Sequence, residues 1–452
     1  MKLQGYQRMI FVALFLGYAC YSYNRKSVSF ALPALTAEGL SNEQAGTMMS
    51  AQNLAYAGSK FTCGVLADRL STRLLFGVGL VLSGLVTLGF SATSVSSLAG
   101  YLVSILWCLN GITQGCGWPA LVKLLQQWFP PSSFGTSYGI LAASSNISLS
   151  LAPVLASFLI LNYDWRVSLL VAGALPIVAG LASRLALVDK PTDVGLQAVV
   201  EDAWQGEDDR SLATVMDLVK SPFIWLMSLG YLTAFGAKTG AVDWGQLYLI
   251  QDLGHSQFAA SALMSCIEAG GLLGGILAGY LTDTKVRTSD SSRSSPRVPL
   301  AVLFTACSAV AFHLLGFNVD REVLGGEFPR TTFPGTCLQL WWIGAIGLVL
   351  GVGTYGPMAI FGVVASESAP AHLTSTSHAI VALAGSVGGV LAGLPFSFIA
   401  EYYRWRGVFL LLEVVSAVTA VLLFLGRNLN SRLGSRSENT EMLPVAAPPE
   451  AA

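Results

Sequence analysis

Residues 64–73 read GVLADRLSTR, a short polar break between two long apolar runs, and residues 279–283 read GYLTD, which repeats its glycine and aspartate at the same spacing. Other landmarks recur in the same order: Pro119 with Pro357, Pro130 with Pro370, Pro153 with Pro395, and Trp165-Arg166 with Trp405-Arg406. The offset is about 215 residues before the polar stretch 318–339 and about 240 after it, so one inserted loop accounts for the change. The chain is therefore an internal duplication.

The composition indicates a membrane protein. Hydrophobic residues make up 53% of the 452 residues, charged residues make up 11%, and the mean hydropathy is +0.61. A soluble domain carries about 25% charged residues. The formal net charge of −1 carries no information about partners. We expect an all-α, polytopic membrane protein that has the lipid bilayer, and no nucleic acid, as a partner.

Apolar stretches of about 20 residues predict twelve transmembrane helices in two six-helix repeats. They lie near 8–30, 44–67, 75–95, 98–125, 133–160, 167–188, 222–250, 257–282, 299–317, 340–364, 374–400 and 406–426. Because these runs are continuous, they exclude the alternating pattern of a membrane β-barrel. The domains that we expect are an N-terminal half at 1–189, a cytoplasmic linker at 190–219, a C-terminal half at 220–427 and a disordered cytoplasmic tail at 428–452.

Lysine and arginine indicate the orientation. With a cytoplasmic N-terminus, fifteen of these cations fall in cytoplasmic segments, five fall on the opposite side and five fall within helices. This distribution fits the positive-inside rule. The first apolar run lacks a clear small-residue cleavage site and continues past residues 24–26, so we interpret it as a helix and not as a signal peptide. Both termini are predicted to be cytoplasmic.

Two of the cations within helices, Arg25 and Lys238, occupy matching positions in the two halves. A cation at the bilayer centre costs roughly 2.5–3.5 kcal/mol on insertion scales, so a repeated one predicts a functional site for an anion. A phosphate monoester carries about −1.5 to −2 charges at pH 7, and a planar guanidinium binds its oxygens bidentately. Arg25 supplies this fork, and Lys238 adds a point charge from the other half.

Polar residues on the same helices extend the predicted site. Tyr56 and Lys60 are four residues apart and share a helix face, as do Tyr21 and Arg25, which fits a polar cavity lining. The alternative is that Lys60 extends toward an interface and that the tyrosines pack. Trp118, next to a proline, either stacks on a sugar ring or fills a kink.

Two further residues have alternatives of the same kind. His378, in the predicted helix 374–400, either donates a hydrogen bond to substrate or packs against a backbone carbonyl. Asp243 either neutralises Lys238 or binds sugar hydroxyls. Lys26 points about 100° away from Arg25 around a helix and therefore needs its own partner, for which Glu268 is the best candidate.

The loop GVLADRLSTR resembles the signature loop of the major facilitator superfamily, whose twelve helices form two six-helix halves around a midplane site. The resemblance implies structural or gating roles for Gly64, Asp68 and Arg69, and for Asp283 in the weaker second copy. It implies the same class of role for Lys26 and Glu268.

Three segments narrow the resemblance to the organophosphate:phosphate antiporter family: YSYNRK at 21–26, AYAGSKF at 55–61 and KTGAVDW at 238–244. Others are similar to its endoplasmic-reticulum glucose-6-phosphate translocase branch: GAKT at 236–239, DWGQ at 243–246, ESAP at 367–370 and TSHAIVAL at 376–383. The resemblance runs from about residue 4 to 430. It implies that Asn24 and Gln246 join the substrate-binding residues, together with Tyr21, Tyr56, Lys60, Trp118, Asp243 and His378.

The chain departs from the family pattern at two positions. Ser145 precedes Asn146 where several bacterial relatives have a histidine, and Lys238 stands where they have an arginine. A lysine offers a compact charge in place of a bidentate fork. Binding details of the bacterial relatives therefore do not transfer as a whole.

The predicted function is exchange of glucose 6-phosphate for inorganic phosphate across the endoplasmic reticulum membrane by alternating access, with no cofactor. The resemblance also implies functional coupling to a lumenal glucose-6-phosphatase. The alternatives are an antiporter of another organophosphate, such as glycerol 3-phosphate or phosphoenolpyruvate, and a phosphate-ester sensor that transports little.

An enzyme is not expected from this sequence. A membrane phosphatase needs a nucleophile with acid–base partners, and no strong cluster of that kind is apparent. Residues 351–356 fit G-x-G-x-x-G, but they lie in a predicted membrane helix without a preceding strand. The seven cysteines have neither metal-binding spacing nor the pattern of a disulfide framework.

Overall fold

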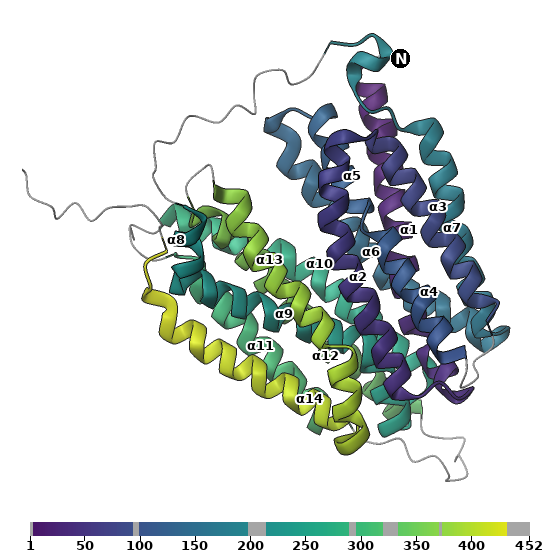
Figure 1. The fold of residues 1–452 in the computed structure, drawn as a ribbon. Coiled ribbons are helices and arrows are strands. Elements are labelled where there is room, and N and C mark those ends of the chain that lie inside the picture. The colour runs from purple at the N-terminus through teal and green to yellow at the C-terminus, as the bar shows by residue number, and fades with distance from the viewer. Residues whose placement is uncertain are drawn as a thin grey trace, which may run out of the picture.

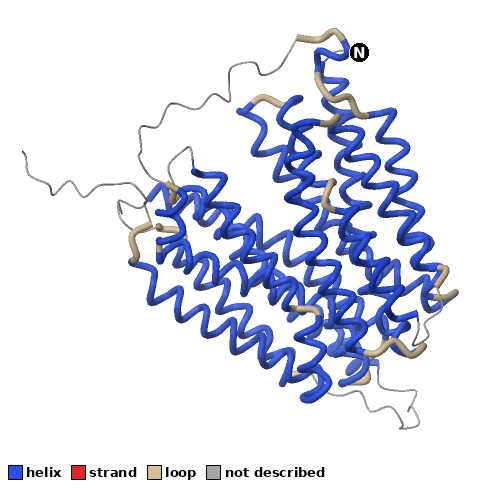
Figure 2. The backbone as a smooth tube through the Cα atoms, in the orientation of Figure 1, coloured by secondary structure: helices blue, strands red, loops and turns tan. Residues whose placement is uncertain are grey.

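The computed structural model describes residues 3–93, 99–197, 214–288, 295–319, 333–369 and 373–431. Nearly all of these residues are helical (Figure 1, Figure 2). The helices of the first half are α1 (Leu3–Ala37), α2 (Asn42–Arg69), α3 (Thr72–Ser91), α4 (Ala99–Gln114), α5 (Gly117–Trp128), α6 (Pro131–Asn162) and α7 (Trp165–Ala186), followed by the 3-10 turn η1 (Pro191–Val194).

The second half begins after the linker. Its helices are α8 (Val215–Lys220), α9 (Pro222–Leu247), α10 (Gln257–Thr288), α11 (Val298–Phe317), α12 (Phe333–Glu367), α13 (Thr374–Leu391) and α14 (Leu394–Leu425). A π-turn, η2 (Tyr248–Asp252), extends α9, and a 3-10 turn, η4 (Gly426–Asn428), ends α14. Arg404 has φ 57° and ψ 177°, which breaks α14 into two helices.

The fourteen α-helices of the described residues make twelve transmembrane units, as the sequence predicts. The six-residue α8 is too short to span a bilayer, and α4 and α5 are one helix broken at residues 115–116. The helix 374–400 is likewise broken, because it consists of α13 and the first part of α14. By length and composition alone, seven described helices qualify as membrane spans. α1 and α2 are not among them, and both carry polar side chains inside the protein.

The helices of each half pack mainly against one another. α1 contacts α6 and α7, and α3 contacts α7; in the second half α9 contacts α13, α10 contacts α12, and α11 contacts α14. Two groups of helices therefore lie side by side, joined by α10 against α6 and α2 against α14 (Figure 1). The exact domain borders stay predictions, since residues 198–213 of the linker and 432–452 of the tail lie outside the described residues.

An apolar cluster closes the protein at the end far from the N-terminus. Val28 and Leu35 of α1 and Met49 of α2 are buried in one cluster with Trp244 of α9 and Trp405 of α14. The two tryptophan rings stack with centroids 4.7 Å apart. Because residues of both halves contribute, this cluster joins the halves at that end.

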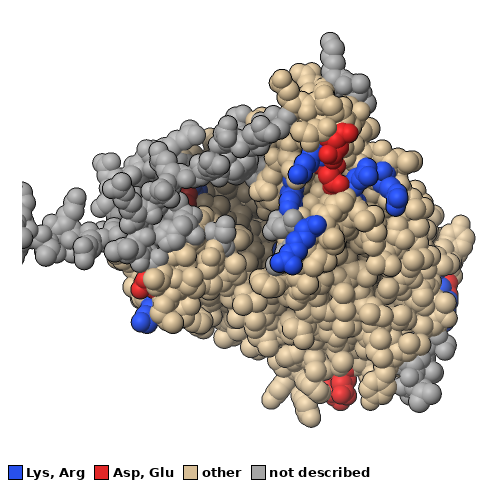
Figure 3. All heavy atoms as spheres, turned by 45° about the horizontal axis from the view of Figure 1, so that its top comes forward, with Lys and Arg blue, Asp and Glu red and all other residues tan. Residues whose placement is uncertain are grey.

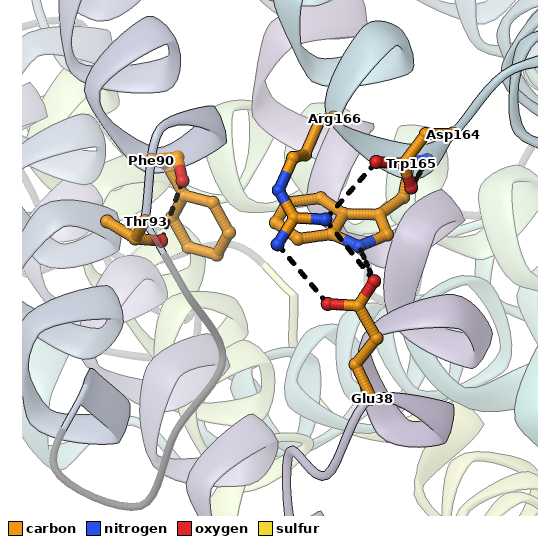
Figure 4. Close-up of polar contacts among 6 residues, drawn as sticks. All are labelled: Glu38, Phe90, Thr93, Asp164, Trp165 and Arg166. Carbon is orange, nitrogen blue, oxygen red and sulfur yellow. Dashed lines mark hydrogen bonds and ion pairs between the residues drawn. The ribbon is translucent and has the colours of Figure 1, made fainter.

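A polar cluster lies at the same end (Figure 4). Glu38, just after α1, accepts a hydrogen bond from Trp165 Nε1 at 2.7 Å and one from Arg166 Nη1 at 3.3 Å. In the second half, Trp405 Nε1 donates to Gln251 Oε1 at 2.9 Å. Both repeated tryptophans therefore connect the last helix of their half to the end of its first helix, so the duplication extends to a tertiary contact.

α2 and α4 cross closely because glycines lie at the contact, one in the last turn of α4 and one directly after its end. A Cβ atom at Gly111 would lie 2.4 Å from the carbonyl oxygen of Gln52, and one at Gly115 would lie 2.6 Å from the backbone nitrogen of Lys60. Small residues four positions apart allow such an approach of membrane helices. Gly58, also on α2, has no neighbour within 4 Å of its Cβ position.

We expect Gly111→Ala to lower the melting temperature of the detergent-solubilised protein. Alanine gains about 1 kcal/mol in helix propensity over glycine, but here its methyl group meets backbone that cannot move aside cheaply. Gly58→Ala is the matched control, and its melting temperature should stay unchanged or rise. Equal melting temperatures for the two variants would mean that the close crossing does not stabilise the fold.

Candidate functional site

A cavity of about 890 Å³ is lined by α1, α2, α5 and α6 of the first half and by α9 and α13 of the second. The described lining residues are Tyr18, Arg25, Asn53, Tyr56, Ala57, Lys60, Phe61, Gly64, Ala67, Trp118, Pro119, Val122, Lys123, Gln126, Tyr138, Ser145, Tyr231, Phe235, Lys238, Thr376, His378, Ala379, Ile380, Ala382, Leu383 and Ser386. They extend from the middle of α1 to the ends of α2 and α5 on the side of the N-terminus. The cavity therefore opens there, opposite the closed end, and basic side chains border a hollow in that face (Figure 3).

Arg25 lies at the inner part of this cavity. Its Cζ atom is 4.4 Å from the centroid of the Tyr56 ring, and Tyr18 also interacts with its guanidinium. The buried Nε and Nη2 atoms reach no hydrogen-bond partner among the residues that the structure describes. A buried charged donor without an acceptor is unfavourable, so this guanidinium is suited to receive an anion.

Lys238 lines the cavity from α9. Its Nζ atom lies 5.0 Å from the ring centroid of Tyr355, whose hydroxyl donates to Glu268 Oε2 at 2.5 Å. Glu268 and Arg25 are both close enough to act electrostatically on Lys238, the first by attraction and the second by repulsion. The two cations that the sequence places at matching repeat positions thus line one cavity.

Positive charge dominates the cavity wall. Lys60 and Lys123 line it as well, and its described lining residues include neither aspartate nor glutamate. Lys123 Nζ donates to the carbonyl oxygen of Ala67 at 2.7 Å, whereas Lys60 is exposed. A concave surface with one sign of charge and apolar surroundings concentrates ligands of the opposite sign. The wall is therefore suited to an anionic ligand.

Aromatic and imidazole groups complete the wall. The Trp118 ring lies 4.9 Å from the Tyr18 ring and 5.1 Å from the Tyr138 ring, centroid to centroid. His378 is exposed to the cavity, and its Nδ1 lies 3.2 Å from the carbonyl oxygen of Gly362. A neutral imidazole that donates from Nδ1 has an acceptor at Nε2, which suits a hydroxyl group better than a phosphate oxygen.

Three residues predicted to bind substrate lie in the protein interior instead. Tyr21 donates to a backbone carbonyl of α3 at 2.9 Å, Asn24 donates to α3 and α7 at 2.8 Å, and Gln246 donates to Ser261 Oγ at 3.0 Å. The described cavity lining does not include them. The structure therefore does not bring these three side chains into the cavity, and a substrate-binding role for them stays a prediction.

The predicted pair of Lys26 and Glu268 is wrong. Lys26 Nζ lies 2.6 Å from Asp243 Oδ1, which also accepts a hydrogen bond from Ser29 Oγ at 2.8 Å. α1 packs against α9, so the side of α1 that carries Lys26 meets Asp243 and not the more distant α10. Asp243 pairs with Lys26, although its charge also attracts Lys238, so the two roles considered for it stay predictions; Glu268 is held by Tyr355.

The signature loop is only partly described. Gly64 lines the cavity, and Arg69 is exposed at the end of α2. The side chains of Asp68 and Asp283 lie outside the described residues, so their gating roles stay predictions.

The last residues of this loop are hydrogen-bonded to Asp189, which lies at the end of the first half. Asp189 accepts hydrogen bonds from Ser71 Oγ at 2.5 Å, Thr72 Oγ1 at 2.7 Å and the backbone nitrogen of Arg73 at 2.8 Å. Partial burial acts to raise the pKa of Asp189, but these hydrogen bonds outweigh it and leave the pKa below its usual value. The carboxylate thus stabilises the N-terminus of α3 as long as it stays ionised.

Tyr18 and Tyr231 are cavity residues that the sequence analysis missed. Each lies seven positions before a central cation, Tyr18 before Arg25 and Tyr231 before Lys238. Seven residues rotate about 20° short of two full turns, whereas four residues overshoot one turn by about 40°. The seven-residue spacing therefore identifies the cavity face better than the four-residue spacing that suggested Tyr21.

Comparisons with known proteins agree with this geometry. The family model described as "Major Facilitator Superfamily" matches residues 14–393. The chain is 30% identical to a "Probable hexose phosphate transport protein" of Chlamydia trachomatis, with 94% of this chain and 91% of that protein covered. It is 28% identical to the "Membrane sensor protein UhpC" of Escherichia coli (strain K12), with 92% and 91% covered. A solved D-xylose-proton symporter superposes with a TM-score of 0.68 at 15% identity, over 94% of this chain and 98% of that one.

We expect Lys26→Met to destabilise the protein by about 3–5 kcal/mol, because it leaves Asp243 charged and buried without its partner. The double variant Lys26→Met/Asp243→Asn should be milder than the sum of its single variants. Lys26→Met/Glu268→Gln, the matched comparison, should be close to additive. Thermal unfolding in detergent measures all of these variants, and stronger coupling of Lys26 to Glu268 than to Asp243 would contradict the pairing.

Proposed function

Since this chain belongs to the major facilitator superfamily, we propose that it is a secondary transporter that exchanges glucose 6-phosphate for inorganic phosphate by alternating access. The cavity is closed at one end and open at the other, as one state of such a cycle requires. The observation that carries the proposal is Arg25, whose Nε and Nη2 atoms are buried beside a cationic cavity and have no hydrogen-bond partner among the described residues.

A phosphate group fits this arrangement chemically. Its oxygens accept paired hydrogen bonds from a guanidinium, and its charge of about −1.5 to −2 at pH 7 matches two cations better than a single carboxylate would. Arg25 takes the fork position, and Lys238 contributes charge from the opposite half. Inorganic phosphate and a phosphate ester share this recognition, so both are able to occupy the site in turn.

The remainder of the wall supports a sugar as the ester group. Trp118, Tyr18 and Tyr138 form an aromatic surface, and His378 presents an imidazole on the other half. Aromatic faces pack on apolar groups, and an imidazole acceptor binds a hydroxyl. The name of the Chlamydia relative, a probable hexose phosphate transport protein, favours the same class of substrate.

The charge of the empty cavity explains why the protein would exchange anions and not carry one anion in a single direction. Without an anion, Arg25 and Lys238 repel each other inside the protein, and Glu268 offsets this only beside Lys238. The conformational change between the two open states passes through a closed form. Its free-energy cost is then higher for the empty protein than for the protein with phosphate or sugar phosphate bound. Net movement in one direction is therefore slow unless an anion returns.

The proposed setting is the endoplasmic reticulum membrane, with both termini in the cytoplasm. The distribution of lysine and arginine supports this orientation, in which the cavity opens to the cytoplasm. Uptake of glucose 6-phosphate would supply a lumenal glucose-6-phosphatase, whose phosphate product returns through the same site. The compartment and this coupling rest on the sequence resemblance.

A sensor is the second candidate function, because the chain is also similar to a membrane sensor protein over 92% of its length. In a sensor the same cavity would bind a phosphate ester, but the resulting conformational change would signal to a partner protein. Such a protein would transport little substrate. The two functions differ in turnover, since a sensor binds substrate with little flux.

The test is uptake of labelled glucose 6-phosphate into proteoliposomes that hold inorganic phosphate, compared with empty ones. An exchanger gives fast uptake only with internal phosphate. Unlabelled glycerol 3-phosphate and phosphoenolpyruvate, added as competitors, test the other organophosphates. Binding without uptake would favour the sensor, and strong inhibition by glycerol 3-phosphate alone would favour a different substrate.

We expect Arg25→Lys to lose most exchange although the charge is kept, because an ammonium cannot form the paired hydrogen bonds of a guanidinium. Loss of a bidentate charged contact corresponds to roughly tenfold or more in apparent affinity. Arg184→Lys, at an exposed position at the end of α7, is the matched control and should exchange normally. Near-normal exchange by Arg25→Lys would remove Arg25 from the anion site.

We expect Lys238→Gln to reduce the dependence of uptake on internal phosphate. The variant binds phosphate more weakly, but its empty cavity carries one charge less and changes state more easily. Phosphate-loaded vesicles should therefore lose more uptake than empty ones. Lys220→Gln, exposed on α8, should behave as the unmodified protein does. An unchanged ratio of loaded to empty uptake in Lys238→Gln would contradict the electrostatic origin of exchange.

A further inference from the structure

Cys63 and Cys116 are brought into contact by the fold. Cys63 lies in α2 and Cys116 lies 53 positions later at the start of α5, yet their Sγ atoms are 2.7 Å apart. Both are free thiols. Sequence spacing offers no reason to pair them, because the contact depends on how α2 and α4 cross.

The close crossing of α2 and α4 explains the contact. Gly111 and Gly115 let the α4 backbone approach Gln52 and Lys60, and the hydroxyl of Ser59 donates to the carbonyl oxygen of Ile112. Cys63 lies one turn beyond Ser59, and Cys116 directly follows Gly115. The two sulfur atoms therefore face each other beside this close crossing.

A separate groove leads to this thiol pair. It has a volume of about 420 Å³, lies between α2, α3 and α4, and is lined by both cysteines together with Thr62, Val78, Leu82 and Thr113. The groove is distinct from the central cavity, since neither cysteine lines that cavity. Cys63 is 6% exposed and Cys116 is more accessible, so a small uncharged oxidant meets Cys116 first.

We propose that Cys63 and Cys116 form an oxidisable dithiol that hydrogen peroxide converts to a disulfide. In the first step the Cys116 sulfur attacks the peroxide, the O–O bond breaks, and a sulfenic acid and one water form. In the second step Cys63 attacks that sulfur, the S–O bond breaks, one S–S bond forms, and a second water leaves. The two thiols lose two electrons to the peroxide, and their protons leave in the water.

The disulfide would restrain the helix that forms one wall of the central cavity. The helix is interrupted at residues 115–116, and α5, which packs against α2, carries Trp118 and Lys123 into the cavity that Tyr56 and Lys60 of α2 also line. A bond from Cys116 to Cys63 fixes the start of α5 to α2 and opposes bending at the interruption. Slower exchange in the oxidised form is the expected consequence, and this consequence alone rests on the proposed function.

The experiment treats the purified full chain in liposomes with hydrogen peroxide. Digestion without reductant, followed by mass spectrometry, should yield a peptide pair linked through Cys63 and Cys116 that a phosphine reductant separates. In Cys63→Ser, a dimedone probe should label Cys116 as the trapped sulfenic acid; in Cys116→Ser, labelling and linkage should both be lost. Cys108→Ser, in α4 away from the pair, is the control and should keep the linkage.

Two further readouts test the consequence. The oxidised protein should melt at a higher temperature, because the new link restricts the unfolded chain. Its glucose 6-phosphate exchange should fall several-fold and recover on reduction, with no such fall in either serine variant. Absence of the linked peptide would overturn the dithiol, and a linked protein with unchanged exchange would overturn the restraint. A protein that forms the link but exchanges nothing in either form would refute the proposed function and leave the dithiol standing.

Discussion

A guanidinium held in the interior without a balancing carboxylate is the constraint on which the rest of the structure depends. Arg25 is stabilised by the Tyr56 ring and by Tyr18, but two of its buried nitrogen atoms have no hydrogen-bond partner among the described residues. Such a charge is costly inside a protein unless a partner compensates it. In the proposed function that partner is an anion, which would enter through the open end of the cavity and its cationic wall while the opposite end stays closed.

The fold treats two adjacent cations of α1 in opposite ways. Lys26 is neutralised by Asp243 at 2.6 Å and joins the halves, whereas Arg25 lines the cavity. Successive helical residues point about 100° apart, so one faces α9 and the other faces the cavity. The second half is arranged differently, because Lys238 has Glu268 nearby. One cation of the pair is thus partly compensated, which gives the empty site a moderate charge in place of two unopposed ones.

The duplication preserves contacts and not only helices. Trp165 and Trp405 make corresponding connections within their halves, and Tyr18 and Tyr231 stand in the same relation to the two central cations. The two halves differ in the polar groups that they place in the cavity. The first half has a guanidinium for paired hydrogen bonds, and the second has an ammonium and an imidazole. A ligand with a phosphate at one end and hydroxyl groups at the other matches that difference.

The sequence by itself determined the membrane class, the twelve helices, the repeat and the pair of Arg25 and Lys238, because hydrophobic length and repeat position are properties of the chain alone. Helix periodicity also limits which residues share a face, and the seven-residue spacing would have identified Tyr18. Only the tertiary structure decided that Lys26 meets Asp243, that Asn24 is bound within its own half, and that Cys63 touches Cys116. The physical reason is that periodicity fixes the direction of a side chain around its own helix axis. Which neighbour lies in that direction depends on how the helices pack, and here glycines at a crossing set part of that packing.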